Sequence, residues 1–348
     1  MKEHLYNLAT DRYQGPLALL LKIPLLLLSF VYGAIIRGLI LFYSFRPLKL
    51  NCKVISIGNI TVGGTGKTSL VEFVARFLKA KGHKVAVLSR GYKKLKDSLG
   101  DEPAMLLKNL GGIPVIVDKD RARAARRAVQ EYGADTVILD DGMQQWRIIK
   151  DLEVVAVSAP QGFGNRHMLP RGILREPLSA LKAADLFVLT KTNLTNDLEN
   201  IKSCLNKINA AIPVIESVHE AAGFYEINHP DKSLSLSQLK DKSAALFSGI
   251  GDPYSFTKLI SSLGIKVGLD LRFADHYNYS PEDLSGIISR CREKKLQVII
   301  TTEKDAARLS ESKLKIFKGY PVLVLRIALK ITKNEEQLVT GLLGLYSI

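Results

Sequence analysis

The stretch from Val54 to Leu70 constrains this chain more than any other part of its sequence. It begins as a short apolar, β-branched run, crosses the segment Gly63-Gly64-Thr65-Gly66, and continues into residues whose apolar positions recur at helical spacing. Strand, glycine-rich turn and helix in this order favour a phosphate-binding loop, because backbone N–H groups and the helix N-terminus can surround an anion. Lys67 would reach the β- and γ-phosphates of a nucleotide, and the Thr68 hydroxyl would ligate Mg²⁺.

The loop departs from the pattern G-x-x-x-x-G-K-[ST] at one position, where Thr61 replaces the first glycine. An ordinary glycine-rich turn between a strand and a helix is the alternative interpretation. The run Gly66-Lys67-Thr68 between a strand and a helix favours the phosphate site. We predict nucleotide contacts from the loop and the first helical turn, at Gly63, Gly64, Thr65, Gly66, Lys67, Thr68 and Ser69.

The length and the charge of the chain limit what surrounds this loop. With 348 residues, the chain can form two domains with substantial cores. Its formal charge of +15 implies an anionic partner, which could be nucleic acid, an acidic membrane surface or a phosphorylated substrate. Cys52, Cys204 and Cys291 are far apart in the sequence, which favours neither a disulfide framework nor a metal cluster and fits a reducing compartment.

The N-terminal region contains the most apolar segment, Leu17–Phe42. Only 14 uncharged residues separate Lys22 from Arg37, whereas a simple transmembrane helix needs about 20 apolar residues. A cleaved signal peptide and a buried core helix are the alternatives. We expect a helix that lies in the membrane interface, with four basic side chains meeting lipid phosphates: Lys22, Arg37, Arg46 and Lys49.

Apolar strands alternate with helical segments through the rest of the chain, which favours a parallel sheet covered on both faces. We predict a P-loop NTPase-type α/β domain at 47–215, after an apolar helical segment at 1–46. A smaller α/β domain with a C-terminal helix is expected at 216–348. Further strands are expected at 85–89, 115–117, 136–139, 154–157 and 186–190 in the first domain, and at 244–248, 265–269, 297–301 and 321–325 in the second.

Acidic residues follow the expected strands. Asp140-Asp141-Gly142 ends an apolar strand, where a carboxylate could hold the Mg²⁺ that bridges nucleotide phosphates, although a solvated turn has the same composition. Asp101 could accept the proton of an attacking hydroxyl, but Asp101-Glu102-Pro103 is also typical of a helix start.

Basic residues and one histidine are further candidates. Arg171 and Arg175 could clamp phosphates, or they could form ion pairs on a surface loop. His276 could relay a proton, although a lone loop histidine is the simpler interpretation. The basic helix that begins at Arg121 has no aromatic stacking platform, so it does not favour nucleic-acid binding. Thr190-Lys191-Thr192-Asn193 is close to the guanine-reading motif of GTPases but lacks its acid.

Six motifs occur in order along the chain, and together they resemble the tetraacyldisaccharide 4'-kinases, the lipid A 4'-kinases of Gram-negative bacteria. The resemblance covers nearly the whole chain, including the apolar N-terminus. The motifs are Gly58–Thr68, Ser89–Tyr92, Gly100–Pro103, Asp140–Gln144, Leu169–Pro177 and Asp275-His276.

The resemblance implies an enzyme of lipopolysaccharide biosynthesis that uses ATP and Mg²⁺. Its substrate would be an acylated disaccharide 1-phosphate lipid, phosphorylated on the 4'-hydroxyl. The protein would be peripheral or monotopic at the cytoplasmic face of the inner membrane, with neither nucleic acid nor an obligate protein as a partner. The alternative is a membrane-associated P-loop NTPase that acts as a switch or an assembly factor without a lipid acceptor.

The resemblance also assigns roles to residues that match its motifs. The catalytic group would be Asp101, His276, Lys67, Asp141 and Arg175. Tyr92 would join the loop residues in binding the nucleotide. The metal would be held by residues among Thr68, Asp140, Asp141, Gln144 and Glu176. The substrate would contact Arg121 and Arg171.

The chain departs from the family pattern at four positions. Ser69 stands in place of a common proline, and Lys93 stands in place of a glycine. Met143 replaces a phenylalanine, which is a mild apolar change. Gln145 replaces a histidine, so the resemblance leaves the role of that position open but still implies the same reaction.

Overall fold

A computed structural model describes residues 8–11, 13–90 and 100–347. Tyr92, the expected nucleotide contact, and Lys93 lie outside these ranges. The described residues group into two compact units. Unit 1 contains 8–90 without residue 12, 110–218 and 330–347, and unit 2 contains 100–109 and 219–329.

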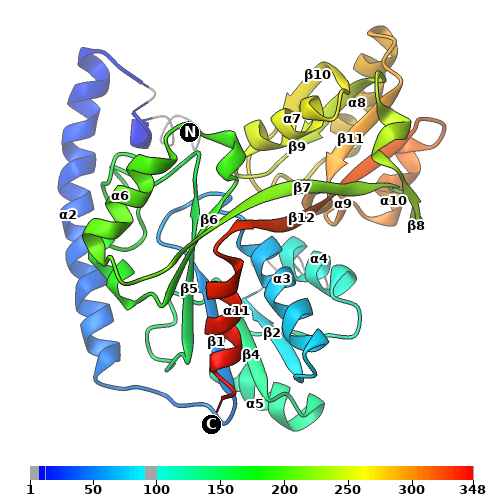
Figure 1. Ribbon diagram of the computed structural model, residues 1–348. Helices are drawn as coiled ribbons and strands as arrows, with labels where there is room; N and C mark the ends of the chain where they lie inside the picture. The colour runs from blue at the N-terminus through cyan, green and yellow to red at the C-terminus, as the bar shows by residue number, and fades with distance from the viewer. Residues whose placement is uncertain (1–7, 12, 91–99, 348) are drawn as a thin grey trace. The chain divides into compact units, whose positions relative to one another are not determined.

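The sheet of unit 1 is parallel, with the strand order β7-β6-β5-β1-β4-β2-β3 (Figure 1). Its central strands are buried along their whole length, as expected of parallel strands covered on both faces. This arrangement confirms the predicted P-loop-type α/β fold. The strands are β1 (Lys53–Gly58), β2 (Val85–Ser89), β3 (Val115–Val117), β4 (Thr136–Asp140), β5 (Leu152–Ser158), β6 (Leu186–Thr190) and the first part of β7 (Val214–Glu226).

Helices cover this sheet. The buried side chains of α3, from Leu70 to Leu78, recur at helical spacing, so one face of that helix packs on the sheet. The helices that follow the strands are α3 (Lys67–Ala80), α5 (Arg121–Tyr132), η1 (Leu178–Ala183), η2 (Thr192–Leu194), α6 (Leu198–Ile208) and α11 (Glu335–Gly344).

The C-terminal helix α11 belongs to unit 1, although the sequence placed it with the smaller domain at 216–348. A Cβ atom at Gly341 would lie 3.0 Å from Leu186 Cδ1, so the helix backbone runs close to β6. Beyond the helix, Tyr346 stacks on His83, and its hydroxyl lies 2.7 Å from Thr136 Oγ1. These contacts join residues that are far apart in the sequence, which a local pattern does not reveal.

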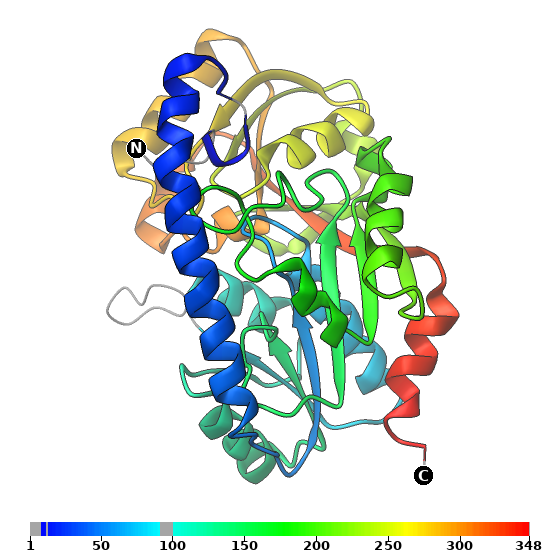
Figure 2. The same cartoon turned by 90° about the vertical axis from the view of Figure 1, so that its left-hand side faces the viewer.

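The apolar N-terminal segment forms one long helix, α2 (Pro16–Ser44), which runs along unit 1 (Figures 1 and 2). Ser29 Oγ donates a hydrogen bond to Met168 O at 2.7 Å, and Tyr32 OH donates to Arg175 O at 3.1 Å. By length and composition the helix could cross a membrane, and only 11% of its apolar window is buried. This exposure argues against a buried core helix. Apolar side chains on the exposed face include Leu19, Leu20, Leu27, Phe30, Val31 and Ile35.

Unit 2 contains a second parallel set of strands, in the order β10-β9-β11-β12, and confirms a second α/β region. The chain enters this unit within β7 and leaves it within β12. Its strands are β8 (His229–Leu234), antiparallel to the end of β7, with β9 (Ser243–Ser248), β10 (Lys266–Arg272), β11 (Val298–Thr302) and β12 (Val322–Lys333). Its helices are α4 (Asp101–Asn109), η3 (Leu236–Leu239), α7 (Pro253–Ser262), α8 (Pro281–Glu293), α9 (Glu303–Ala306), α10 (Glu311–Leu314) and η4 (Lys315–Phe317).

Helix α4 groups with unit 2, although it lies within the expected first domain at 47–215. Glu102 Oε1 accepts a hydrogen bond from Lys304 Nζ at 2.5 Å, and Asp101 pairs with Arg308. Ion pairs with residues about 200 positions later therefore attach α4 to unit 2.

Candidate active site

The phosphate loop leaves β1 and enters α3 at the carboxyl edge of the unit 1 sheet. Gly66 caps the helix in the left-handed conformation (φ 78°), which glycine adopts without a steric penalty. Lys67 begins the helix, so its N-terminal N–H groups face the loop. This is the strand–loop–helix arrangement that the sequence predicted, and it suits an anion such as a nucleotide phosphate.

Lys67 and Arg175 converge on Asp141 within unit 1. Lys67 Nζ lies 3.3 Å from Asp141 Oδ1, and Arg175 makes a bidentate pair with the same carboxylate at 2.9 Å for each nitrogen. Lys67 Nζ also donates to Asn59 Oδ1 at 2.9 Å, and Arg175 Nη2 donates to the same oxygen. The structure therefore places three of the expected catalytic side chains together and adds Asn59.

Electrostatics favour the ionised form of Asp141. Burial alone would raise the pKa of this carboxyl, but the Lys67 ammonium and the Arg175 guanidinium hold it below its ordinary value. The pKa of Arg175 is raised by its hydrogen bond and charge pairing with Asp141, against the effect of burial. Asp141 also has a left-handed backbone (φ 57°), an uncommon conformation outside glycine that often marks functional sites.

Oxygen ligands for Mg²⁺ lie in the same unit. Asp140 ends β4 and pairs in register with Ile57 of β1, which places it beside the start of the phosphate loop. Thr68 is buried in the first turn of α3, and Gln144 Oε1 is buried with no hydrogen-bond partner among the described residues. Mg²⁺ prefers oxygen ligands and is commonly held by one or two carboxylates together with phosphates and water. These residues fit the ion, and the part of the chain that the structure describes has no cluster of three or more His, Cys, Asp or Glu that could hold a metal.

Glu176 lies in a buried hydrogen-bond network. Its Oε1 accepts from Gln144 Nε2 at 2.6 Å and from Trp146 Nε1 at 3.2 Å, and Gln144 Nε2 also donates to Asn59 O at 3.0 Å. Burial raises the pKa of Glu176. The hydrogen bond to Glu176 orients the Gln144 amide, which also contacts the backbone oxygen of Asn59.

Unit 2 contains a second charged group, formed by Asp101, His276 and Arg308. His276 Nδ1 lies 2.9 Å from Asp101 Oδ2, which also accepts from Arg308 Nε at 2.9 Å and from Nη2 at 2.5 Å. Burial alone would raise the pKa of Asp101, but His276 and Arg308 lower it. His276 has a left-handed backbone (φ 58°), and its pKa is raised mainly by the hydrogen bond with Asp101. His276 is therefore not a lone loop histidine.

Arg308 also forms an ion pair with Asp305, which is fully buried. Arg308 Nη1 donates to Asp305 Oδ1 at 2.9 Å and to Gly249 O at 2.6 Å. The same Asp305 oxygen accepts from Tyr279 OH at 2.7 Å. The guanidinium thus has a fixed position from which it restrains the Asp101 carboxylate.

The two expected substrate arginines lie in different surroundings. Arg121 begins α5 and is buried; its Nη1 donates to Asp118 O, and its Nε has no hydrogen-bond partner among the described residues. Arg171 Nη2 lies 3.0 Å from Asp11 Oδ1, and Lys22 pairs with the same carboxylate. Arg171 therefore joins the segment before α2 in this structure, and a substrate contact by Arg171 stays a prediction.

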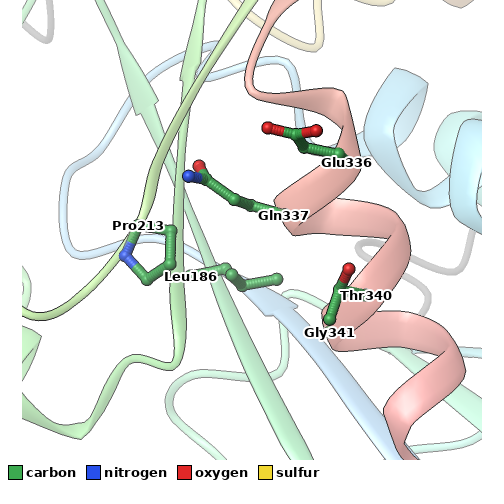
Figure 3. Close-up of a pocket in the computed structure, with 6 residues that line it drawn as sticks. All are labelled: Leu186, Pro213, Glu336, Gln337, Thr340 and Gly341. Carbon is green, nitrogen blue, oxygen red and sulfur yellow. The ribbon is translucent and has the colours of Figure 1, made fainter.

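Two cavities of unit 1 differ in their relation to this site. One, of about 660 Å³, lies beside the second half of α2 and includes Trp146 and Glu176 in its wall. The other, of about 450 Å³, lies between α11 and the first residue of β6, Leu186 (Figure 3). Leu186 is at the amino end of β6, whereas the phosphate loop is at the carboxyl edge of the sheet, so the second cavity is not part of the site.

Sequence reasoning missed Asn59 and Arg308. Asn59 lies inside the motif Gly58–Thr68, but its contact with Arg175 joins residues that are 116 positions apart in the sequence. Arg308 lies just after α9, and no local pattern singled it out. The strand-end position of Asn59, directly after β1, is the one signal that could have identified it.

The parallel sheet, the glycine-rich loop and the charged group around Lys67 define a P-loop nucleotide-binding α/β protein. Residues 21–345 match the family described as Tetraacyldisaccharide-1-P 4'-kinase, and this chain belongs to that family. It is 34% identical to the tetraacyldisaccharide 4'-kinase of Halothermothrix orenii, over 97% of both chains. It is 33% identical to that of Syntrophus aciditrophicus, over 94% of this chain and 93% of the relative.

A solved structure agrees with this assignment. The fold is similar to a crystal structure of LpxK from Aquifex aeolicus in complex with ATP, with a TM-score of 0.71 and 28% identity. The match covers 94% of this chain and 100% of that chain.

Proposed function

We propose that this protein transfers the γ-phosphate of ATP to the 4'-hydroxyl of a tetraacyldisaccharide 1-phosphate, a step of lipid A biosynthesis. The observation that carries the proposal is the convergence of Lys67 and Arg175 on Asp141 beside a phosphate loop, in a chain that matches the kinase family over residues 21–345. The high positive charge of the chain suits an anionic nucleotide and a phosphorylated lipid.

The residues of unit 1 hold the phosphate donor. Loop N–H groups and the N-terminus of α3 bind the phosphates, and the Lys67 ammonium contacts the β- and γ-oxygens. Arg175 neutralises negative charge on the γ-phosphoryl group during transfer, as arginines do in other phosphoryl-transfer enzymes. Asn59 and Asp141 hold both cations at the end of the loop.

Thr68 and the acidic end of β4 would hold Mg²⁺, with Asp140 supplying the carboxylate and Gln144 Oε1 a further oxygen. Bound Mg²⁺ would neutralise charge on the β- and γ-phosphates. Glu176 keeps Gln144 in place through their 2.6 Å hydrogen bond.

The residues of unit 2 act on the acceptor. Asp101 orients the sugar hydroxyl and takes its proton as the phosphorus–oxygen bond forms. His276 and Arg308 lower the pKa of Asp101 and so favour its ionised form, which makes it a weak base. A weak base suffices because charge in a loose phosphoryl-transfer transition state develops on the phosphoryl oxygens rather than on the attacking oxygen. His276 and Arg308 set the orientation of the carboxylate.

Helix α2 places the enzyme at a membrane surface. Its exposed face is apolar, whereas Ser29 and Tyr32 attach its opposite face to the loop that carries Arg175. An amphipathic or embedded helix of this kind holds an enzyme where its lipid substrate lies. We place the protein at the cytoplasmic face of the inner membrane, where ATP is available.

The direct test is transfer of labelled γ-phosphate from ATP to purified tetraacyldisaccharide 1-phosphate by the full-length protein in mixed micelles. We expect label in the lipid only when both Mg²⁺ and the 1-phosphate acceptor are present. ATP consumption at the same rate with and without the acceptor would contradict the proposal and favour a switch or assembly NTPase.

A further inference from the structure

The run that begins at the last residue of β6, Thr190-Lys191-Thr192-Asn193, resembles a guanine-reading motif without its acid. In the structure its first two residues contact the phosphate loop. Lys191 Nζ donates a hydrogen bond to Gly64 O at 2.8 Å, and Thr190 Oγ1 donates to Thr65 O at 2.9 Å. Thr190 is fully buried and Lys191 is 5% exposed, so these contacts are shielded from water.

A third side chain contacts the same loop from the turn after β5. Gln161 Nε2 donates to Val62 O at 3.0 Å. A Cβ atom at Gly63, which has φ 118°, would lie 2.9 Å from both amide heteroatoms of Gln161, so the two residues are in close contact. Three side chains thus bind three carbonyl oxygens of one loop, and we refer to Gln161, Thr190 and Lys191 as the carbonyl clamp.

The clamp determines which way the loop peptides face. In a trans peptide the C=O and the following N–H are fixed on opposite sides of one plane. When the carbonyls of Val62 and Thr65 are held by side chains, the N–H groups of Gly63 and Gly66 point away from those side chains. N–H groups that converge on one side of a loop form an anion site.

Lys191 occupies a left-handed backbone conformation, with φ 58°. Non-glycine residues adopt this region at an energetic cost, and they retain it where surrounding contacts hold them. Asp141 and His276, both in the charged groups described above, have the same conformation. The Lys191 side chain contacts the loop rather than solvent.

We propose that Gln161, Thr190 and Lys191 are positioning residues that hold the phosphate loop in its anion-binding conformation, with Lys191 setting much of the affinity for ATP. The inference rests on the function proposed above, because it assigns a role to residues behind the same nucleotide site. The clamp acts through the loop backbone, so it affects the nucleotide and not the lipid acceptor.

Lys191→Met tests the proposal, because methionine keeps an unbranched side chain and removes the ammonium donor. We expect the Kd for Mg·ATP, measured by calorimetry on the full-length protein without acceptor, to rise about tenfold, the effect of one hydrogen bond from a charged donor. The KM for ATP should rise by a similar factor while the KM for the lipid acceptor is unchanged. Lys191→Arg keeps a donor and should recover most of the affinity.

Lys182→Met is the matched control, since Lys182 is exposed in the same unit and makes the same change of charge. Thr190→Val, which is nearly isosteric, should also weaken ATP binding. Wild-type affinity in Lys191→Met would overturn the proposal, as would equal losses for ATP and acceptor together with a lower melting temperature. The binding assay contains no acceptor, so it does not depend on the proposed function. If Lys191→Met weakens ATP binding but the wild-type protein transfers no phosphate to the lipid, only the proposed function is contradicted.

Discussion

The side-chain oxygen of Asn59 accepts a hydrogen bond from the Lys67 ammonium at 2.9 Å, immediately after β1 ends. Asn59 is fully buried, and its amide nitrogen donates to Thr61 O at 2.7 Å, so its orientation is fixed. The same oxygen accepts from Arg175. One neutral amide therefore holds both cations that would act on the transferred phosphate.

Asn59→Ala should lower kcat by about 10- to 100-fold, because hydrogen bonds between Asn59 and charged donors are lost. The measurement is steady-state kinetics at saturating ATP and acceptor. Asn209→Ala, at an exposed asparagine of the same unit, is the control and should behave as wild type. A kcat within twofold of wild type for Asn59→Ala would show that Asn59 does not position the two cations for transfer.

Lys67→Ala should reduce kcat/KM by at least about 10²- to 10³-fold, because a preorganised cation is lost from the transferred phosphate. The variant should keep its melting temperature within a few degrees, since Lys67 is a polar residue at a helix start. Lys79→Ala, on an exposed position of the same helix, provides the comparison. Turnover at the wild-type rate in Lys67→Ala would show that the loop lysine is not catalytic.

Asp101→Asn should abolish phosphoryl transfer while leaving the affinity for ATP unchanged, because the ATP-binding loop lies in unit 1 and Asp101 lies in unit 2. Removal of the carboxylate leaves the acceptor hydroxyl without its proton acceptor. The variant should be assayed for both label transfer and nucleotide binding, with Glu311→Gln as a control at an exposed acid of unit 2. Phosphoryl transfer at the wild-type rate by Asp101→Asn would show that Asp101 is not the proton acceptor.

The pairing of His276 with Asp101 should make stability depend on pH. The pKa of His276 is raised in the folded state by its hydrogen bond with Asp101, so the folded protein binds the proton more tightly than the unfolded chain. The stabilisation is then complete below the unfolded pKa of about 6.5 and is lost as the pH rises through the folded-state value. His276→Asn should therefore lower the melting temperature more at about pH 5.5 than at about pH 9.

Melting curves of wild type, His276→Asn and the control His229→Asn would measure this difference. His229 is an exposed histidine of β8 in the same unit. A difference between wild type and His276→Asn that stays constant over this pH range would contradict protonation of the pair.

Membrane association should depend on the exposed face of α2. Replacing Leu19, Leu20, Leu27 and Phe30 together by glutamine should abolish sedimentation with anionic lipid vesicles, because burial of four large apolar side chains is lost. The ATP affinity should not change. The same change at the exposed apolar residues Ile149 and Tyr254 is the control, and vesicle binding that survives the α2 substitutions would point to another membrane surface.

Local patterns predicted much of the fold. The strands β2, β3 and β6 have the expected bounds, and α5 begins at the expected residue Arg121. Apolar runs and helical periodicity predict such elements because they are properties of neighbouring residues. The apolar segment Leu17–Phe42 forms most of the helix α2, which extends from Pro16 to Ser44. Its exposure, which separates a membrane helix from a core helix, is a property of the whole fold.

Local patterns also predicted some residues of the candidate site, whereas others became evident only from the family resemblance and the structure. The phosphate loop was visible in the sequence because its glycines, Lys67 and Thr68 are adjacent and their spacing carries the function. For His276 the sequence alone favoured a lone loop histidine, and family resemblance was needed to connect it with Asp101. The structure places the two side chains 2.9 Å apart within unit 2.

The sequence by itself determined the class of fold, the nucleotide-phosphate loop and the apolar character of the N-terminal segment. Tertiary structure alone decided which side chains hold that machinery in place. Lys191 contacts Gly64 across 127 positions, and Arg308 contacts Asp101 across 207. Such contacts form only when the sheet brings strand ends together, so no local pattern of residue types encodes them.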